Sequence, residues 1–196
     1  LLLGLAFLVF IAASLTSLAR APAKNATKTA ILLSVLSLTG AIALGMLLAR
    51  GYAAGLALPY ASLATAHISL ALGGWVLLLV IGVSYQVVPM FQLTPPYRNW
   101  IARRLPLGLT ALLVAWSLSV AAGEPAAALR DALSVLLGLA AIGFAAETLR
   151  LQRLRRRRHV DATFLFWRTA MMALIAAVGL ALITTVNQLS TAVVSL

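Results

Sequence analysis

Six long apolar stretches, separated by short charged segments, constrain this chain more than any other feature of its sequence. They run approximately over residues 1–19, 29–49, 60–90, 105–122, 129–149 and 164–194. A helix of about 20 apolar residues crosses the hydrocarbon of a bilayer, and only helices or closed barrels satisfy every backbone polar group there. The sequence therefore predicts an all-α, polytopic bundle of about six transmembrane spans, with residues 1–196 as a single transmembrane domain.

The composition supports a membrane protein and excludes an ordinary soluble domain. Hydrophobic residues make up 63% of the chain and charged residues only 10%, whereas soluble domains are near half apolar and about a quarter charged. There is no cysteine, so disulfides, thiolate metal sites and cysteine nucleophiles are excluded.

The fifteen Lys and Arg residues, which give a net charge of +11, are placed as in a membrane protein rather than as in a nucleic-acid-binding one. Thirteen of them lie in or beside the first, third and fifth loops, whereas Arg50 and Arg130 stand alone. Cytoplasmic loops carry an excess of Lys and Arg, and basic clusters beside spans bind lipid headgroups. We therefore expect the basic loops to be cytoplasmic, both termini to lie outside, and membrane lipids rather than nucleic acid to be partners. The expected location is the inner membrane of a bacterium.

Ionisable side chains inside the spans are rare, which makes each of them a candidate for function. All four carboxylates fall in loops or at span ends: Glu124, Asp131, Glu147 and Asp161. A proton-coupled transporter is disfavoured, because no carboxylate is expected at mid-membrane. Of the two histidines, His159 follows four arginines and is expected to be a solvated loop residue.

His67 differs, because it lies about seven residues into the third span, roughly 10 Å deep at 1.5 Å per residue. A buried imidazole needs a partner, and two interpretations are open. The histidine can bond to a Ser, Thr or backbone carbonyl of an adjacent helix, or it can be an axial ligand of haem iron. Ala71 and Gly74 follow on roughly the same helix face. Such small residues leave room for a flat ring, but they equally allow another helix to approach closely.

The segment from Ala66 to Trp75, continuing from Gly82 to Pro89, resembles the tenth helix of haem-copper oxidase subunit I. The likeness is to the cbb-type and nitric-oxide-reductase-like branches and their stand-alone membrane relatives. That helix has a His-x-His pair, then Gly-Trp, then a glycine, a tyrosine and a proline. The sequence matches this spacing at five further positions: Gly74, Trp75, Gly82, Tyr85 and Pro89. The loop Thr94-Pro95-Pro96-Tyr97 and the segment Phe166-Trp167-Arg168 add weaker likeness.

The resemblance implies that His67 is the ligand of a b-type haem, with Ala71 and Gly74 beside it. The family's second histidine, which holds a low-spin haem, falls on Ser69, so this sequence lacks that ligand. The family's copper ligands lie on earlier helices, and these residues do not support a copper site. The chain opens Leu1-Leu2-Leu3, and we expect it to be the C-terminal part of a longer protein. The implied activity is reduction or sensing of oxygen or nitric oxide, with an electron donor or other respiratory membrane subunits as partners. Whether the chain is an enzyme stays open.

A second interpretation comes from a different class of protein, a non-catalytic membrane subunit or scaffold without a cofactor. In that case His67 and Tyr85 are packing residues, and the helices rich in Ala, Gly and Ser pack against partners. A transporter half is a third possibility, disfavoured by the lack of paired, glycine-broken spans.

Overall fold

A computed structural model describes residues 2–21, 25–156 and 159–194, with side chains described up to residue 185 apart from that of Glu124. The described residues form helices and no strand. Lys24, Arg157 and Arg158, which contribute to the predicted basic loops, lie outside the described residues. Six helical segments are long and apolar enough to cross a membrane, as predicted. They are α1 (Leu2–Arg20), α2 (Ala26–Ala54), a continuous helix over Tyr60–Gln92, α5 (Asn99–Ala122), α6 (Ala127–Arg153) and α7 (Ala162–Val194).

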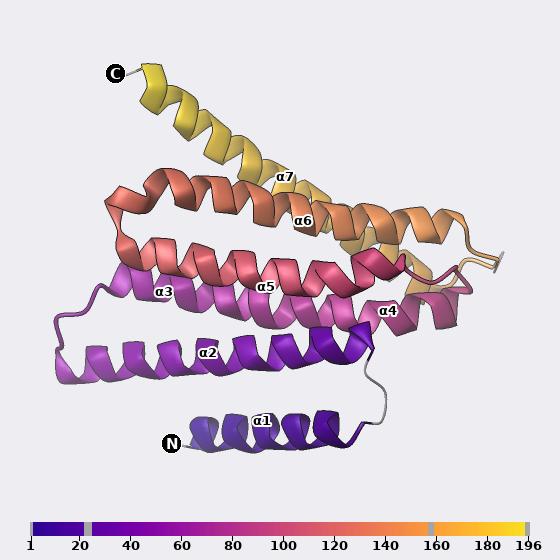
Figure 1. The fold of residues 1–196 in the computed structure, drawn as a ribbon, viewed down its shortest axis with the longest axis horizontal. Coiled ribbons are helices and arrows are strands. Elements are labelled where there is room, and N and C mark those ends of the chain that lie inside the picture. Colours follow the sequence, from indigo (N-terminus) through magenta and orange to yellow (C-terminus); the bar gives the residue numbers. More distant parts are fainter. Residues whose placement is uncertain (1, 22–24, 157–158, 195–196) are drawn as a thin grey trace.

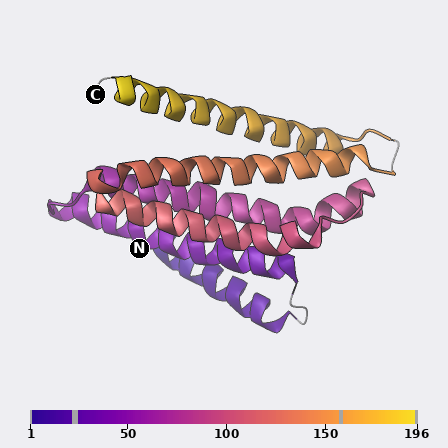
Figure 2. The same ribbon diagram turned by 45° about the horizontal axis from the view of Figure 1, so that its top comes forward.

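The helices run antiparallel in chain order, each beside the one before it (Figure 1). The α1–α2, α4–α5 and α6–α7 connections lie at one end of the bundle, on the right in Figure 1. We call this the basic end, because the predicted basic loops lie there. Both chain ends lie at the opposite end with the α2–α3 and α5–α6 connections. The turned view in Figure 2 shows the same arrangement. The structure thus separates basic from non-basic loops as the charge pattern predicted.

The third span contains three helical segments: α3 (Tyr60–Ser69), a π-helix η1 (Leu70–Leu77) and α4 (Leu78–Gln92). A π-helix adds a residue to each turn, and π-bulges inside α-helices often occur at functional sites. This segment contains Gly73, Gly74 and Trp75. The sequence did not predict the π-helix.

Residue types at the helix ends explain where several of these segments begin and end. Asn25 caps α2, because its side chain accepts a hydrogen bond from the Lys28 amide at 2.8 Å, and asparagine is a preferred N-cap. Gly55 ends α2 with a left-handed φ of 61°, which glycine adopts without strain. The third span ends at Gln92, close to the predicted residue 90, with Pro89 inside the helix and Pro95 and Pro96 after it. The fourth span begins at Asn99, earlier than the predicted residue 105.

Helix α2 packs against one face of the third span over its full length. Added methyl groups would lie 2.6 Å from Cβ of Ser37 at Gly74 and 3.0 Å from Cβ of Ala30 at Gly82. Such distances are shorter than van der Waals contact, so the two backbones approach where these glycines lie. This is close helix packing of the kind that small residues allow in membranes. The helix face predicted to carry His67 and Gly74 is therefore the α2-facing side, and Gly82 lies on it too.

Candidate functional sites

His67 contacts the backbone of α2 through one ring nitrogen. Its Nδ1 lies 2.7 Å from the carbonyl oxygen of Ala41. A carbonyl oxygen only accepts hydrogen bonds, so Nδ1 carries the proton and donates it. When the imidazole is neutral, this contact selects the tautomer whose lone pair is on Nε2.

Gly45, one turn beyond Ala41, makes room for the imidazole ring. A methyl group at Gly45 would lie 3.0 Å from Cε1 and 3.3 Å from Nδ1 of His67, but 3.8 Å from Nε2. The buried side-chain polar atoms without a partner, among the described residues, belong to Tyr85, Gln92 and Gln152. Nε2 of His67 is not one of them, and the side chain is half-buried. We conclude that Nε2 faces the accessible side of the α2–α3 contact.

The other predicted site residues lie along the same helix, but only one of them packs tightly. A methyl group at Gly74 would lie 2.8 Å from Oγ of Ser37 and 3.0 Å from Cδ2 of Leu113. Close approach of α2 and α5 therefore takes up the space beside Gly74. Ala71 is half-buried. Ser69, at the position of the second family histidine, donates its hydroxyl to the Thr65 carbonyl of its own helix at 2.9 Å.

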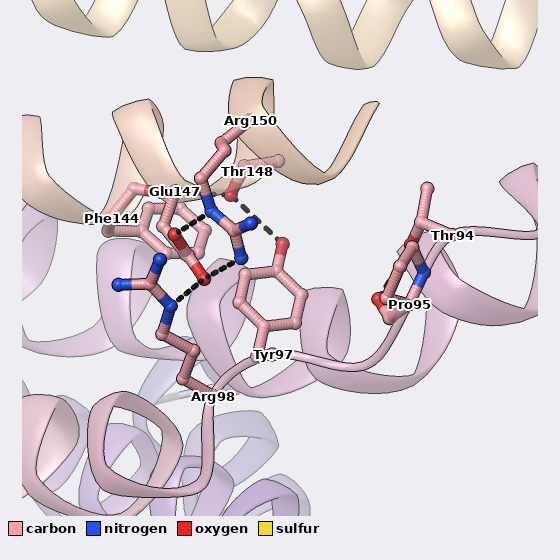
Figure 3. Close-up of polar contacts among 8 residues, drawn as sticks. All are labelled: Thr94, Pro95, Tyr97, Arg98, Phe144, Glu147, Thr148 and Arg150. Carbon is pink, nitrogen blue, oxygen red and sulfur yellow. Dashed lines mark hydrogen bonds and ion pairs between the residues drawn. The ribbon is translucent and has the colours of Figure 1, made fainter. Parts of the chain in front are cut away.

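A second group of polar side chains lies at the basic end, and Figure 3 shows its centre. Tyr97, in the α4–α5 connection, is 5% exposed. Its hydroxyl lies 2.9 Å from Oγ1 of Thr148 on α6, and Thr148 donates to the Phe144 carbonyl at 2.9 Å. The Thr148 proton is thus used within α6, so Tyr97 is the donor of the pair. Burial raises the pKa of the Tyr97 phenol, which keeps that donor protonated.

The Glu147 carboxylate lies beside this hydrogen bond and forms ion pairs with two arginines. It is 7% exposed, and its carboxylate accepts two hydrogen bonds from Arg150, from Nε at 2.7 Å and from Nη2 at 2.8 Å. Nε of Arg98 lies 3.7 Å from the same carboxylate (Figure 3). Two hydrogen bonds from one guanidinium are the stronger form of carboxylate pairing. The sequence placed Glu147 at a span end but did not predict its burial or its partners.

Two buried glutamines complete the basic end. Gln92 at the end of α4 is 3% exposed and Gln152 near the end of α6 is 4% exposed. None of their four amide atoms has a hydrogen-bond partner among the described residues. A buried polar group without a partner costs about 1–3 kcal/mol. A backbone hydrogen bond links the two segments just after these glutamines: the Arg156 amide donates to the Leu93 carbonyl at 3.1 Å.

His159 is exposed in the α6–α7 connection, as predicted. Within the described part of the chain, no group of three or more His, Cys, Asp or Glu side chains is placed to hold a metal ion. Searches of protein-family models, curated proteins and solved structures find no match to the chain. These searches therefore assign no function to the His67 region or to the basic end.

Proposed function

We propose that this integral membrane protein is haem-copper-oxidase-like and binds a b-type haem through Nε2 of His67, for reduction or sensing of oxygen or nitric oxide. One observation carries the proposal: Nδ1 of His67 donates to the Ala41 carbonyl at 2.7 Å, within the first part of a membrane span. Histidines that bind metal usually donate their other ring N–H to a carbonyl or carboxylate, which orients the ring and raises its basicity. Imidazole is also a common axial ligand of haem iron.

The residues near His67 fit a haem in their donor chemistry and restrict where it can lie. Nε2 supplies a neutral imidazole lone pair, and Gly45 leaves space for the ring that carries it. Ser37 and Leu113 fill the space at Gly74. Half-buried Ala71, on the accessible side of this contact, is the residue that would border a porphyrin held by His67. When bound, the haem supplies an iron centre that binds a diatomic ligand, and the protein orients it through the histidine.

Ser69 makes the proposed site one with a single protein ligand. Its hydroxyl is used by the Thr65 carbonyl of its own helix, and a serine does not replace the family's second histidine as a haem ligand. A haem with one axial histidine keeps a coordination position free for a small molecule. We propose a bacterial inner membrane as the location, with the basic loops cytoplasmic. Electrons would come from a donor or from respiratory membrane subunits.

The haem content of the purified protein tests this proposal. We expect a Soret band in the wild type, retained in His159→Ala and lost in His67→Ala. His159 is a matched control because it is the other histidine and lies exposed in a connection. A folded wild type without haem, when haem is supplied during expression, would contradict the proposal, as would a Soret band that His67→Ala leaves unchanged.

A membrane scaffold without a cofactor is the second candidate, and the packing at Gly74 favours it. At Gly74, the small residues of the third span let Ser37 of α2 pack closely against it. A hydrogen bond from His67 to a neighbouring helix also needs no metal. Unlike the third span, α1 has no buried residue, so its surface away from the contact with α2 is open to lipid or to other subunits. In this case the wild type carries no haem, and His67→Ala only lowers stability.

A further inference from the structure

A cavity of about 590 Å³ lies at the basic end, between the start of α2, the last turns of α4 and the start of α5. It is separate from His67, which lies near the opposite end of the third span. Its wall includes the polar residues Asn25, Tyr85, Gln86, Tyr97, Asn99 and Arg103. Ala26, Ala102 and Leu107 form part of the apolar surface of the wall. The cavity thus combines polar and apolar surfaces where a span meets the membrane interface.

The charge of the wall is positive and is not balanced by the described residues. Arg103 lines the cavity and is exposed, and no carboxylate is among the lining residues. The ion pairs of the described chain join Glu147 to Arg98 and Arg150, and neither involves Arg103. Arginine binds phosphate oxygens through a planar fork of N–H donors. The cavity therefore favours an anion over a neutral ligand.

Tyr85 adds a hydroxyl group that has no protein partner. Its Oη is buried and makes no hydrogen bond within the described part of the chain. The neighbouring Tyr97 cannot supply one easily, because its ring packs edge-on against Tyr85 at 5.0 Å and its hydroxyl already bonds Thr148. A buried hydroxyl without a partner is unfavourable. Because Tyr85 lines the cavity, a small rotation of its ring would let a ligand oxygen accept from this hydroxyl and remove the cost.

The backbone at the cavity also favours negative charge. Both α2 and α5 begin at the wall, and the N-terminal amides of a helix carry partial positive charge. The N-cap of α5, Arg98, makes no side-chain capping bond, so the first amides of that helix lack this partner. These amides add to the field of Arg103 but do not by themselves define the site.

We propose that this cavity binds the phosphodiester of an anionic membrane phospholipid, of the phosphatidylglycerol class. Arg103 pairs with the phosphate oxygens, and Tyr85 donates to an oxygen of the headgroup. The polar amides of Asn25 and Gln86 suit the glycerol hydroxyls, and Leu107 lies on the apolar wall where the acyl chain begins. Anionic lipids are attracted to basic residues at the membrane surface. The unbalanced positive charge and the unpaired hydroxyl of this cavity would localise such a lipid at this one site.

Lipid binding by the full-length chain in detergent, measured by native mass spectrometry, tests this site. Phosphatidylglycerol is titrated against phosphatidylcholine as the probe lipids. We expect Arg103→Gln to weaken phosphatidylglycerol binding by about tenfold, as loss of a charge-assisted hydrogen bond predicts. Arg104→Gln removes the same charge at the next position, which does not line the cavity, and should leave the affinity unchanged. The melting temperature of each variant verifies that the bundle is folded.

A pair of tyrosine variants tests the hydroxyl contact. Tyr85→Phe should weaken phosphatidylglycerol binding by several-fold, about the value of one neutral hydrogen bond. Tyr52→Phe is the control, since Tyr52 is exposed near the end of α2 and stacks on Tyr60. Equal effects of Arg103→Gln and Arg104→Gln, or equal affinity for the two lipids in the wild type, would overturn the proposal. Displacement of the lipid by millimolar inorganic phosphate would assign the cavity to free phosphate and overturn the lipid assignment.

Discussion

The His67 region and the basic end use polar side chains in opposite ways. Around His67, one imidazole makes one hydrogen bond to a neighbouring backbone, among small apolar residues. At the basic end, Tyr97 and Arg98 of the α4–α5 connection contact Thr148 and Glu147 of α6 through one hydrogen bond and one ion pair. Polar groups near the interface reach water and partners at low cost, whereas a polar group deep in a span is costly. The polar contacts at the basic end thus tie the α4–α5 connection to α6, whereas the single polar contact of His67 orients one ring that can serve a function.

The largest effect is expected where α2 meets the third span. Gly74→Ala would place a methyl group 2.6 Å from Cβ of Ser37, so α2 must move. We expect the free energy of unfolding to fall by about 2–3 kcal/mol, the range for overpacking. Denaturation by sodium dodecyl sulfate in mixed micelles measures it.

Gly73→Ala is the matched control for this substitution. A methyl group there would meet Leu113 at 3.5 Å, which is ordinary contact. Alanine also favours a helix over glycine by up to about 1 kcal/mol. Equal destabilisation by the two variants would show that α2 does not pack as described.

Gly45→Ala separates the two interpretations of His67. Its methyl group would lie 3.0 Å from Cε1 of the imidazole, which pushes the ring from the Ala41 carbonyl. We expect stability to fall by about 1 kcal/mol, the value of one hydrogen bond, and the haem content to fall with it. Gly40→Ala, whose methyl group meets Leu70 at 3.4 Å, should change neither. Full haem content in Gly45→Ala would argue that the Nδ1 contact does not orient the ligand.

The bond between Tyr97 and Thr148 should contribute about 1 kcal/mol of coupling, as a buried hydrogen bond does. Tyr97→Phe, Thr148→Val and the double variant form a mutant cycle that isolates this value. Stability in the same micelle titration is the measurement. If the two single effects simply add, the hydroxyls do not bond each other in the folded protein.

Arg98→Ala should have the smallest effect, less than about 0.5 kcal/mol. Its Nε lies 3.7 Å from the Glu147 carboxylate, and its side chain is 52% exposed, so solvent weakens the pair. Glu147 keeps its two hydrogen bonds from Arg150 in this variant. A loss of more than 1 kcal/mol would mean that Arg98 contributes much more than an exposed pair normally does.

The spans could be predicted from the sequence because apolar length and loop charge are local properties. Hydropathy placed all six helices, and the charge pattern separated the basic end from the opposite end. The spacing of His67, Ala71 and Gly74 also predicted a common face, and His67 and Gly74 on it contact α2. The periodicity of one helix is enough for such a prediction.

The polar contacts could not be predicted, because they join residues far apart in the chain. Tyr97 and Thr148 are 51 positions apart, and a single sequence gives no sign of that pairing. The burial of Glu147 depends on how the α4–α5 connection folds over α6. The π-helix over Leu70–Leu77 has no simple sequence pattern, since an extra residue per turn depends on packing against α2 and α5.

Nitric oxide binding to the reduced protein tests the central claim, a haem held by His67 alone, most directly. The absorption spectrum of the dithionite-reduced wild type is recorded before and after addition of nitric oxide. We predict a five-coordinate ferrous b-type haem in the wild type, with a Soret band that shifts when nitric oxide is added. In His67→Ala, both the haem and this shift should be lost. A six-coordinate haem that does not respond to nitric oxide, or a folded protein that carries no haem, would contradict it.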